Sequence, residues 1–295
     1  MELGATFSHL QAKTLGQNPR DSFTRLLKLP LTHIRLCAYW SEIQPKPEAW
    51  HFAELQWQLQ RAQAAHKQVT LVCGQKSPRW PEFHLPTWLN TPIKHDSAPL
   101  LRYLKKLITQ VQPYHCIKAW QIENEPFDPS GPDQQVIDLN LFTAEVQLVR
   151  SLDHRPIVST VWGNTLLTRA SADLLMPLVD RVGIDIYPTV STNLPTPLPR
   201  YYHQWLPSNW MRTKIRRSLK PIYCAELQAE PWEANQALFL SADQQSMSPA
   251  QLKKNILFAQ SIGIEQIDCW GTEYWLYAQD TLNQDYSEII REFSH

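Results

Sequence analysis

Glutamates follow two of the apolar, strand-like runs in this chain. One run leads into Asn124-Glu125-Pro126, and another ends in Glu226, with Glu230 four residues later. A single glutamate at a strand end most often caps a helix or binds loop backbone. Two carboxyl groups that face each other across a cleft can do more, because one can protonate a leaving oxygen while the other attacks or activates water at an anomeric carbon. The two sites together indicate cleavage of a glycosidic bond.

Eight apolar or β-branched runs recur along the chain, with stretches of helical spacing between them. This order predicts a (β/α)8 TIM barrel. An open doubly wound sheet is the competing architecture, but it usually has a glycine-rich first turn, and the chain has 8 glycines and no G-x-G-x-x-G motif. The predicted strands are 3–8, 32–39, 68–74, 117–123, 156–162, 181–187, 221–226 and 266–270. The clearest predicted helices are 54–67, 98–112, 138–152 and 249–262.

The loops after the predicted strands are expected to carry the site, because active sites of such barrels lie at the C-terminal ends of the strands. The stretches 75–97, 188–200 and 227–248 are long and rich in Pro, Trp and polar residues. No Gly/Ser tract, repeat of solenoid period or low-complexity segment interrupts the chain, so residues 1–295 are predicted to form a single catalytic barrel domain. In a barrel, the ends of the fourth and seventh strands are expected to face each other across the mouth.

The composition excludes several other classes of function. The 28 Lys and Arg balance the 28 Asp and Glu without a basic block, so we expect no nucleic-acid partner and no membrane binding. No apolar run approaches the roughly 18 residues of a membrane span, and no signal peptide is visible. The five cysteines lack C-x-x-C spacing and fit reduced thiols in the cytoplasm, although removal of a leader would allow secretion. Because the histidines lack metal-ligand spacing, we expect no metal and no cofactor.

The chain resembles glycoside hydrolase clan A, the retaining (β/α)8 glycosidases. In that clan the acid/base glutamate follows an asparagine at the end of strand four, and the nucleophile glutamate ends strand seven; Asn124-Glu125-Pro126 and Glu226 match both. Arg35 on the second strand, with Trp40 after it, looks like the Arg-bearing strand of cellulase-like family 5 members. The segment 121–125 is also similar to the strand-four motif of family 35 β-galactosidases.

The resemblance implies a retaining β-glycosidase that hydrolyses a neutral β-linked glycan or glycoside by double displacement. Glu125 would be the general acid and then the general base, and Glu226 the nucleophile. Asn124 would hydrogen-bond the sugar 2-hydroxyl, and Tyr187 would donate its hydroxyl to Glu226. Glu123 has the same strand parity as Glu125 and competes for its role; on the motif it is expected to be inward and structural.

Further substrate contacts are expected from two polar side chains and an aromatic rim. Arg35 lies in an otherwise apolar strand, and since a buried guanidinium needs a partner, it is expected to orient Glu226 or Asn124. Glu230 is a candidate for binding a sugar hydroxyl. A tryptophan is more often core than platform, but four of them follow predicted strand ends, and at least one is expected only to pack. These are Trp40, Trp80, Trp232 and Trp270.

Other classes of protein remain as alternatives. A catalytically inactive glycan-binding barrel would keep the tryptophans but usually lose one carboxylate, and a transglycosylase would pass the same intermediate to a sugar hydroxyl. A metal amidohydrolase needs H-x-H on strand one and a Schiff-base aldolase needs a lysine inside a strand, whereas the chain offers Phe7-Ser8-His9 and Lys118. The partner is expected to be a carbohydrate substrate, bound by a monomer or weak homo-oligomer.

Overall fold

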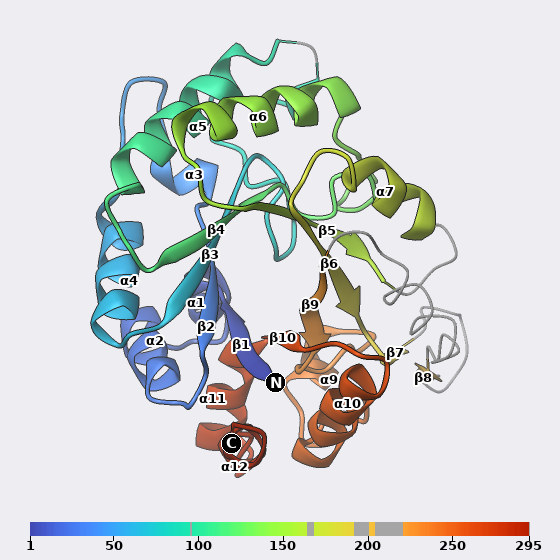
Figure 1. Cartoon of the computed structure of the whole chain (residues 1–295). Helices are drawn as coiled ribbons and strands as arrows, with labels where there is room; N and C mark the ends of the chain where they lie inside the picture. The colour runs from blue at the N-terminus through green and yellow to red at the C-terminus, as the bar shows by residue number, and fades with distance from the viewer. Residues whose placement is uncertain (95, 164–167, 192–200, 204–220, 295) are drawn as a thin grey trace. The chain divides into compact units, whose positions relative to one another are not determined.

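The fold is a closed barrel of eight parallel strands, in the order β1-β10-β9-β6-β5-β4-β3-β2 (Figure 1). The computed structural model describes residues 1–94, 96–163, 168–191, 201–203 and 221–294. A separate antiparallel pair is formed by β7 and β8. The predicted (β/α)8 TIM barrel is thereby confirmed.

All eight predicted strands appear in the structure. The barrel strands are β1 (Glu2–Phe7), β2 (His33–Cys37), β3 (Gln68–Cys73), β4 (Ile117–Ile122), β5 (Ile157–Trp162), β6 (Arg181–Ile186), β9 (Ile222–Gln228) and β10 (Gln266–Trp270). The additional strands are β7 (Thr189–Ser191) and β8 (Tyr201–His203).

Helices alternate with the strands. They are α1 (His9–Thr14), α2 (Pro19–Leu27), α3 (Trp40–Ile43), α4 (Ala53–Ala64), α5 (Ala98–Val111), α6 (Leu139–Leu152), α7 (Thr168–Leu175), α9 (Gln236–Phe239), α10 (Pro249–Ser261), α11 (Thr272–Thr281) and α12 (Ser287–Glu292). Of the long loops expected to carry the site, residue 95 of 75–97 and residues 192–200 of 188–200 lie outside the described residues.

Most strand ends differ by one or two residues from the sequence-based boundaries, and two of these differences concern the glutamates. β4 ends at Ile122, so Glu123 and Glu125 belong to the turn after the strand, where strand parity no longer applies. β9 continues to Gln228, so Glu226 lies inside the strand and not at its end. The last residues of β9 continue the pairing with β10, Leu227 with Cys269 and Gln228 with Trp270. The Gln228 side chain is also bound by the backbone of Thr189, at 2.8 Å to its N–H and 2.6 Å to its carbonyl.

The described residues group into two units. The first comprises Met1–His33, Gly163–Thr165 and Ile184–His295, and the second comprises Ile34–Trp162 and Leu166–Gly183. The single domain over residues 1–295 stays a prediction.

The first unit contains the strand pairs β1–β10 and β10–β9. Helix α11 packs against β1, α1 and α2, and α10 packs against β9 (Figure 1). On β1 a side chain larger than hydrogen is excluded at Gly4. A Cβ there would lie 2.2 Å from Asp268 Oδ1 and 2.3 Å from His33 Nε2, and these two buried side chains contact each other.

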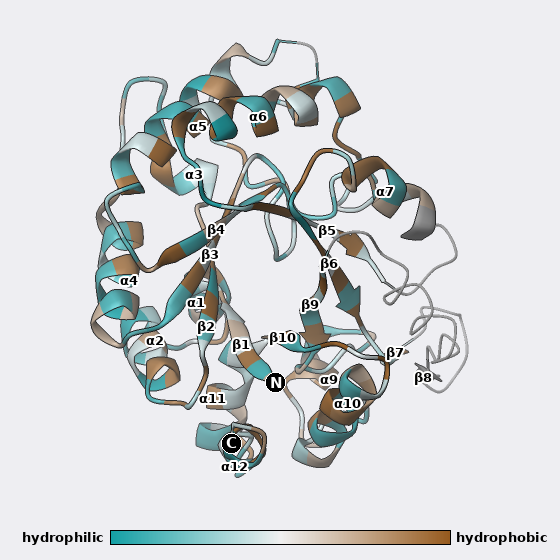
Figure 2. Ribbon diagram, viewed as in Figure 1, coloured by the Kyte–Doolittle hydropathy of each residue, from teal (hydrophilic) through white to brown (hydrophobic). Residues whose placement is uncertain are grey.

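The second unit contains the strands β3, β4 and β5, with α5 and α6 packed on each other (Figure 1). Helix α5 buries residues at helical spacing, from Leu100 through Leu104 and Leu107 to Val111, and Figure 2 shows apolar residues concentrated on the strands and on one side of such helices. The start of α6 is fixed by the Asp138 side chain, which accepts from the N–H groups of Asn140 and Leu141. These elements position the turn after β4.

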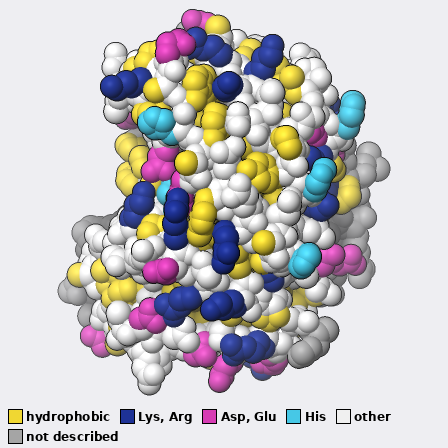
Figure 3. Space-filling view, turned by 90° about the vertical axis from the view of Figure 1, so that its left-hand side faces the viewer, with side chains coloured by type: hydrophobic (Ala, Val, Ile, Leu, Met, Phe, Trp, Pro, Cys, Tyr) yellow, Lys and Arg dark blue, Asp and Glu magenta, His cyan; other side chains and the backbone are white. Residues whose placement is uncertain are grey.

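Charged side chains of both signs lie on the surface (Figure 3), and the cysteines lie in the interior. Acidic and basic side chains are interspersed on the face seen in Figure 3. No helix in the described part of the chain combines the length and apolar character needed to cross a bilayer. All five cysteines are buried, and four of them lie on barrel strands, where burial raises the pKa of the thiols of Cys73, Cys224 and Cys269.

Candidate active site

The backbone of Glu125 is held from both sides. Its N–H donates to Thr160 Oγ1 on β5 at 2.9 Å, and its carbonyl accepts from Lys76 Nζ at 2.6 Å. Glu125 has φ +43°, a left-handed conformation that is uncommon for a residue with a side chain and persists only where neighbours enforce it. The Glu125 side chain is 8% exposed. The turn after β4 therefore holds the backbone of Glu125 in one conformation.

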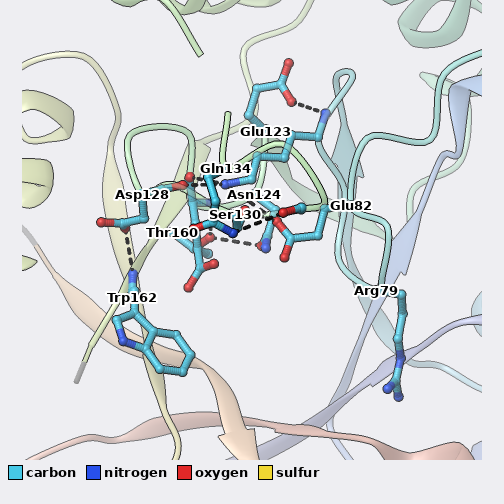
Figure 4. Close-up of polar contacts among 12 residues, drawn as sticks. Arg79, Glu82, Glu123, Asn124, Asp128, Ser130, Gln134, Thr160 and Trp162 are labelled. Carbon is cyan, nitrogen blue, oxygen red and sulfur yellow. Dashed lines mark hydrogen bonds and ion pairs between the residues drawn. The ribbon is translucent and has the colours of Figure 1, made fainter. Parts of the chain in front are cut away.

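Asn124 has its side-chain oxygen fixed by three donors. Thr160 Oγ1 donates to Asn124 Oδ1 at 3.0 Å (Figure 4). Arg35 Nη2 and Gln121 Nε2 donate to the same oxygen, at 2.6 and 3.2 Å. Arg35 is fully buried and also donates from Nε to Gln121 at 2.8 Å. These three donors set the orientation of the Asn124 amide.

Glu123 is the inward, structural member of the pair in the turn. Its carboxylate accepts from the N–H groups of Gln75 (3.0 Å) and Lys76 (2.6 Å), and the side chain is fully buried. It lies against Gly74, where a Cβ would be 2.4 Å from Glu123 Cδ. Burial raises the pKa of Glu123 to about 7, and burial together with the Glu123 charge raises the pKa of the neighbouring Glu145 well above its usual range.

Lys76 is a component of the site that the sequence analysis missed. Its ammonium is fully buried and donates to the carbonyls of Glu125 and Asp128, at 2.6 and 2.8 Å. Glu82 Oε2 lies 3.6 Å from the ammonium and also accepts from the Ser130 hydroxyl, and Figure 4 shows Glu82 and Ser130 side by side. In the sequence Lys76 is a lysine two residues after the predicted strand 68–74, and that position does not reveal its partners.

The tryptophans of the second unit have different environments. Trp40 is fully buried, stacked on Tyr103 at 5.0 Å and edge-on to Trp88 at 6.0 Å, with its indole N–H bound to Gln44. Other aromatic rings occupy the surroundings of the Trp40 indole, so packing is the role that these contacts show. The substrate contact expected of Trp40 stays a prediction. Trp80, in contrast, is 69% exposed.

Trp162 at the end of β5 was missed by the sequence analysis as a possible contact residue. Its indole is half-buried, and its backbone N–H donates to Asp128 Oδ2 at 2.9 Å (Figure 4). Asp128 also accepts from the Ser171 hydroxyl at 2.8 Å. The apolar run that contains Trp162 predicted the strand, but it gave no indication of which of its side chains would remain accessible.

In the first unit, Tyr187 donates its hydroxyl to Glu226. The distance from Tyr187 Oη to Glu226 Oε2 is 2.5 Å, and both side chains are buried, with Glu226 4% exposed. The Tyr187 ring lies edge-on to Trp232, with centroids 5.1 Å apart. Trp232 is 41% exposed, and its backbone N–H is fixed by Ser246 Oγ at 2.8 Å. The geometry expected for Tyr187 is thus present, and Trp232 lies beside it with part of its indole exposed.

Glu230 and Trp270 lie at the ends of neighbouring strands in the same unit. Trp270 is the last residue of β10, pairs with Gln228 in the strand register, and is 8% exposed. Glu230 is also 8% exposed, and it packs over Gly271, where a Cβ would lie 2.3 Å from Glu230 Cβ. Both side chains keep a small solvent-accessible area. Glu230 lies four residues after Glu226, and Trp270 pairs with Gln228, two residues after Glu226. No cluster of three or more metal-binding side chains occurs among the described residues.

No family model matches the sequence, and neither does any curated protein. Solved structures match the fold. An endo-β-1,4-xylanase of glycoside hydrolase family 10 from Gloeophyllum trabeum has a TM-score of 0.60 at 14% identity, over 92% of this chain and 84% of the other. An exo-β-1,4-mannosidase from Opitutaceae bacterium strain TAV5 has a TM-score of 0.67 at 14% identity, over 100% of this chain and 59% of the other.

A GH5_18 from Bifidobacterium longum subsp. infantis has a TM-score of 0.62 at 12% identity, over 99% of this chain and 79% of the other. At such identities the likeness shows the fold, a barrel shared with glycoside hydrolases of families 10 and 5. The expected resemblance to family 35 is not shown by these structures.

Proposed function

We propose that this chain is a retaining β-glycosidase in which Glu125 is the general acid/base and Glu226 the nucleophile. The observation that carries the proposal is the 2.5 Å hydrogen bond from the Tyr187 hydroxyl to Glu226 on a barrel strand. A nucleophilic carboxylate has to be held at one rotation for attack on the anomeric carbon, and a buried tyrosine donor fixes that rotation. The barrel that this chain shares with family 10 and family 5 enzymes supports the same reading.

In the first step, Glu226 attacks the anomeric carbon while Glu125 transfers its proton to the glycosidic oxygen. The bond between the anomeric carbon and that oxygen breaks, the aglycone leaves as an alcohol, and a glycosyl ester forms on Glu226. In the second step, Glu125, now a carboxylate, takes a proton from water, and the water oxygen attacks the anomeric carbon and releases Glu226. Two carboxyl groups are sufficient for this sequence, so no cofactor is proposed.

Asn124 is proposed to stabilise the transition state through the sugar 2-hydroxyl. Its oxygen is already bonded by Arg35, Gln121 and Thr160, so its N–H2 group is pre-oriented as a donor. Because the amide orientation is set before substrate binds, no reorganisation is needed when charge develops at the anomeric centre. The role expected for Arg35, orienting Asn124, is supported by the direct bond between them.

For the substrate, we propose a neutral β-1,4-linked oligosaccharide or glycoside. The formal net charge of the chain is zero, and the exposed indoles of Trp80 and Trp232 offer flat apolar faces to sugar rings. The similar solved structures include an endo-β-1,4-xylanase, an exo-β-1,4-mannosidase and a GH5_18 complex with Manβ1-4GlcNAc. Mannosides and xylosides are therefore the first to be tried, with Glu230 and Trp270 as further proposed contacts.

The proposal is tested by assaying a panel of aryl β-glycosides with the wild type, Glu125→Ala and Glu226→Ala. We expect hydrolysis with retention by the wild type. Added azide should rescue Glu226→Ala with formation of the inverted glycosyl azide, and should rescue Glu125→Ala with retained configuration. A protein that hydrolyses none of the panel but binds β-linked oligosaccharides would contradict the proposal and would support a glycan-binding barrel.

A further inference from the structure

We propose that Lys76 is a positioning residue for the general acid, acting through the backbone of the turn that carries Glu125. This inference rests on the proposed function, since it assigns a task to Lys76 in the reaction of Glu125. It is independent of substrate identity, because every contact that supports it lies within the protein.

Lys76 contacts three consecutive residues of the turn. Its N–H donates to Glu123 Oε2 at 2.6 Å, its carbonyl accepts from the N–H of Asn124 at 2.9 Å, and its ammonium donates to the Glu125 carbonyl at 2.6 Å. The same ammonium donates to the Asp128 carbonyl at 2.8 Å and so closes the turn. A single residue thereby fixes the asparagine and the glutamate of the proposed site relative to the end of β3.

The burial of the ammonium points to this role. A buried lysine normally requires a close carboxylate, because removing its charge from water is costly. Here the carboxylate of Glu82 is at 3.6 Å and is 20% exposed, whereas the two short contacts are to main-chain carbonyls of the turn. The Lys76 ammonium therefore lies closer to the two main-chain carbonyls of the turn than to the carboxylate of Glu82.

The conformation of Glu125 needs such a restraint. Its φ of +43° lies in a region that a side-chain-bearing residue occupies only when its neighbours hold it there. Thr160 binds the Glu125 N–H and Lys76 binds the Glu125 carbonyl, so both ends of this residue are anchored. If the ammonium is removed, the peptide can relax, and the carboxyl group moves away from the position needed for proton transfer.

The test compares leaving groups. The measured quantity is kcat/KM for the 2,4-dinitrophenyl and 4-methoxyphenyl β-glycosides of mannose, xylose and glucose, which reports the glycosylation step. The dinitrophenolate leaves without a proton, whereas the methoxyphenolate requires the acid. In Lys76→Met we expect kcat/KM for the methoxyphenyl glycoside to fall about 100-fold and that for the dinitrophenyl glycoside to fall less than about threefold. Lys76→Arg, which keeps a donor cation, should recover most of the loss.

Controls separate positioning from folding. Lys106→Met removes an exposed lysine on α5 and should leave both activities unchanged. Circular dichroism melts establish which variants fold, and if Lys76→Met does not, Lys76→Gln replaces it with the same expectation. An equal loss for both leaving groups, or no loss, would overturn the inference. Failure of the proposed function is seen separately, because in that case the wild type cleaves neither glycoside or Glu125→Ala retains full activity on the methoxyphenyl glycoside.

Discussion

The buried pair Glu123 and Glu145 should make the stability of this protein fall as the pH rises. Burial raises the pKa of Glu123 from 4.5 to about 7 and that of Glu145 well above its usual range. A carboxyl group whose folded-state pKa is raised contributes its full stability below the unfolded value, near pH 4.5, and loses it as the pH rises through the folded value. Between pH 5 and 7 the folded chain therefore keeps protons that the unfolded chain has released.

The size of the effect follows from the number of protons kept. Each retained proton makes the free energy of unfolding fall by about 1.4 kcal/mol per pH unit. With both carboxyl groups of the pair protonated in the folded state, the slope is about 2.7 kcal/mol per pH unit near pH 6. Glu145→Gln removes one of the two titrating groups, so its slope should be shallower by about 1.4 kcal/mol per pH unit.

The assay is urea unfolding of wild type and Glu145→Gln at half-unit steps from pH 5 to 7. Taking the difference between the two proteins cancels the contributions of the other titrating groups. Glu265→Gln, which replaces an exposed carboxylate, serves as the control for the loss of one charge. Parallel pH dependences for wild type and Glu145→Gln would refute the assignment of a raised pKa to this pair.

Other substitutions test individual features. Tyr187→Phe should lower kcat/KM about 10- to 100-fold, because it removes a hydrogen bond to a carboxylate, and should leave the far-ultraviolet circular dichroism unchanged; full activity would contradict the role of this tyrosine. Trp40→Ala should cost about 3–5 kcal/mol in urea unfolding, whereas Trp80→Ala should change stability by less than about 0.5 kcal/mol; similar costs would contradict the contrast in their burial. Gly74→Ala should cost at least about 2 kcal/mol, measured the same way, since φ is +133° and the new Cβ would meet a buried carboxyl group; a neutral substitution would show that the turn can adapt.

The barrel could be predicted from the sequence because its signal is local. The run 68–74 is mostly apolar or β-branched over the length of a strand, and α5 shows helical spacing throughout. These patterns follow from burial alone. Asn124 and Glu125 could also be recognised from the sequence, because the resemblance to clan A rests on the motif Asn124-Glu125-Pro126.

The finer arrangement of the site depends on contacts that are distant in sequence. Trp40 and Trp80 both follow predicted strands, yet Trp40 begins the short helix α3 and meets Tyr103, whereas Trp80 has no comparable cover. The role of Lys76 depends on carbonyls about 50 residues later, at Glu125 and Asp128, as the sequence separations of these bonds show. The positive φ of Glu125 is imposed by those contacts and has no signature in its own sequence.

The most direct test of the two-carboxylate account is to trap the intermediate. The protein is incubated with 2-deoxy-2-fluoro glycosyl fluorides of mannose, xylose and glucose, for which the second step is slow, and the labelled peptide is identified by mass spectrometry. We predict one sugar per chain, attached to Glu226, and loss of activity at the same rate as labelling. A label on Glu125 or Glu230, or hydrolysis of the aryl glycoside with no covalent label and inverted configuration, would contradict it.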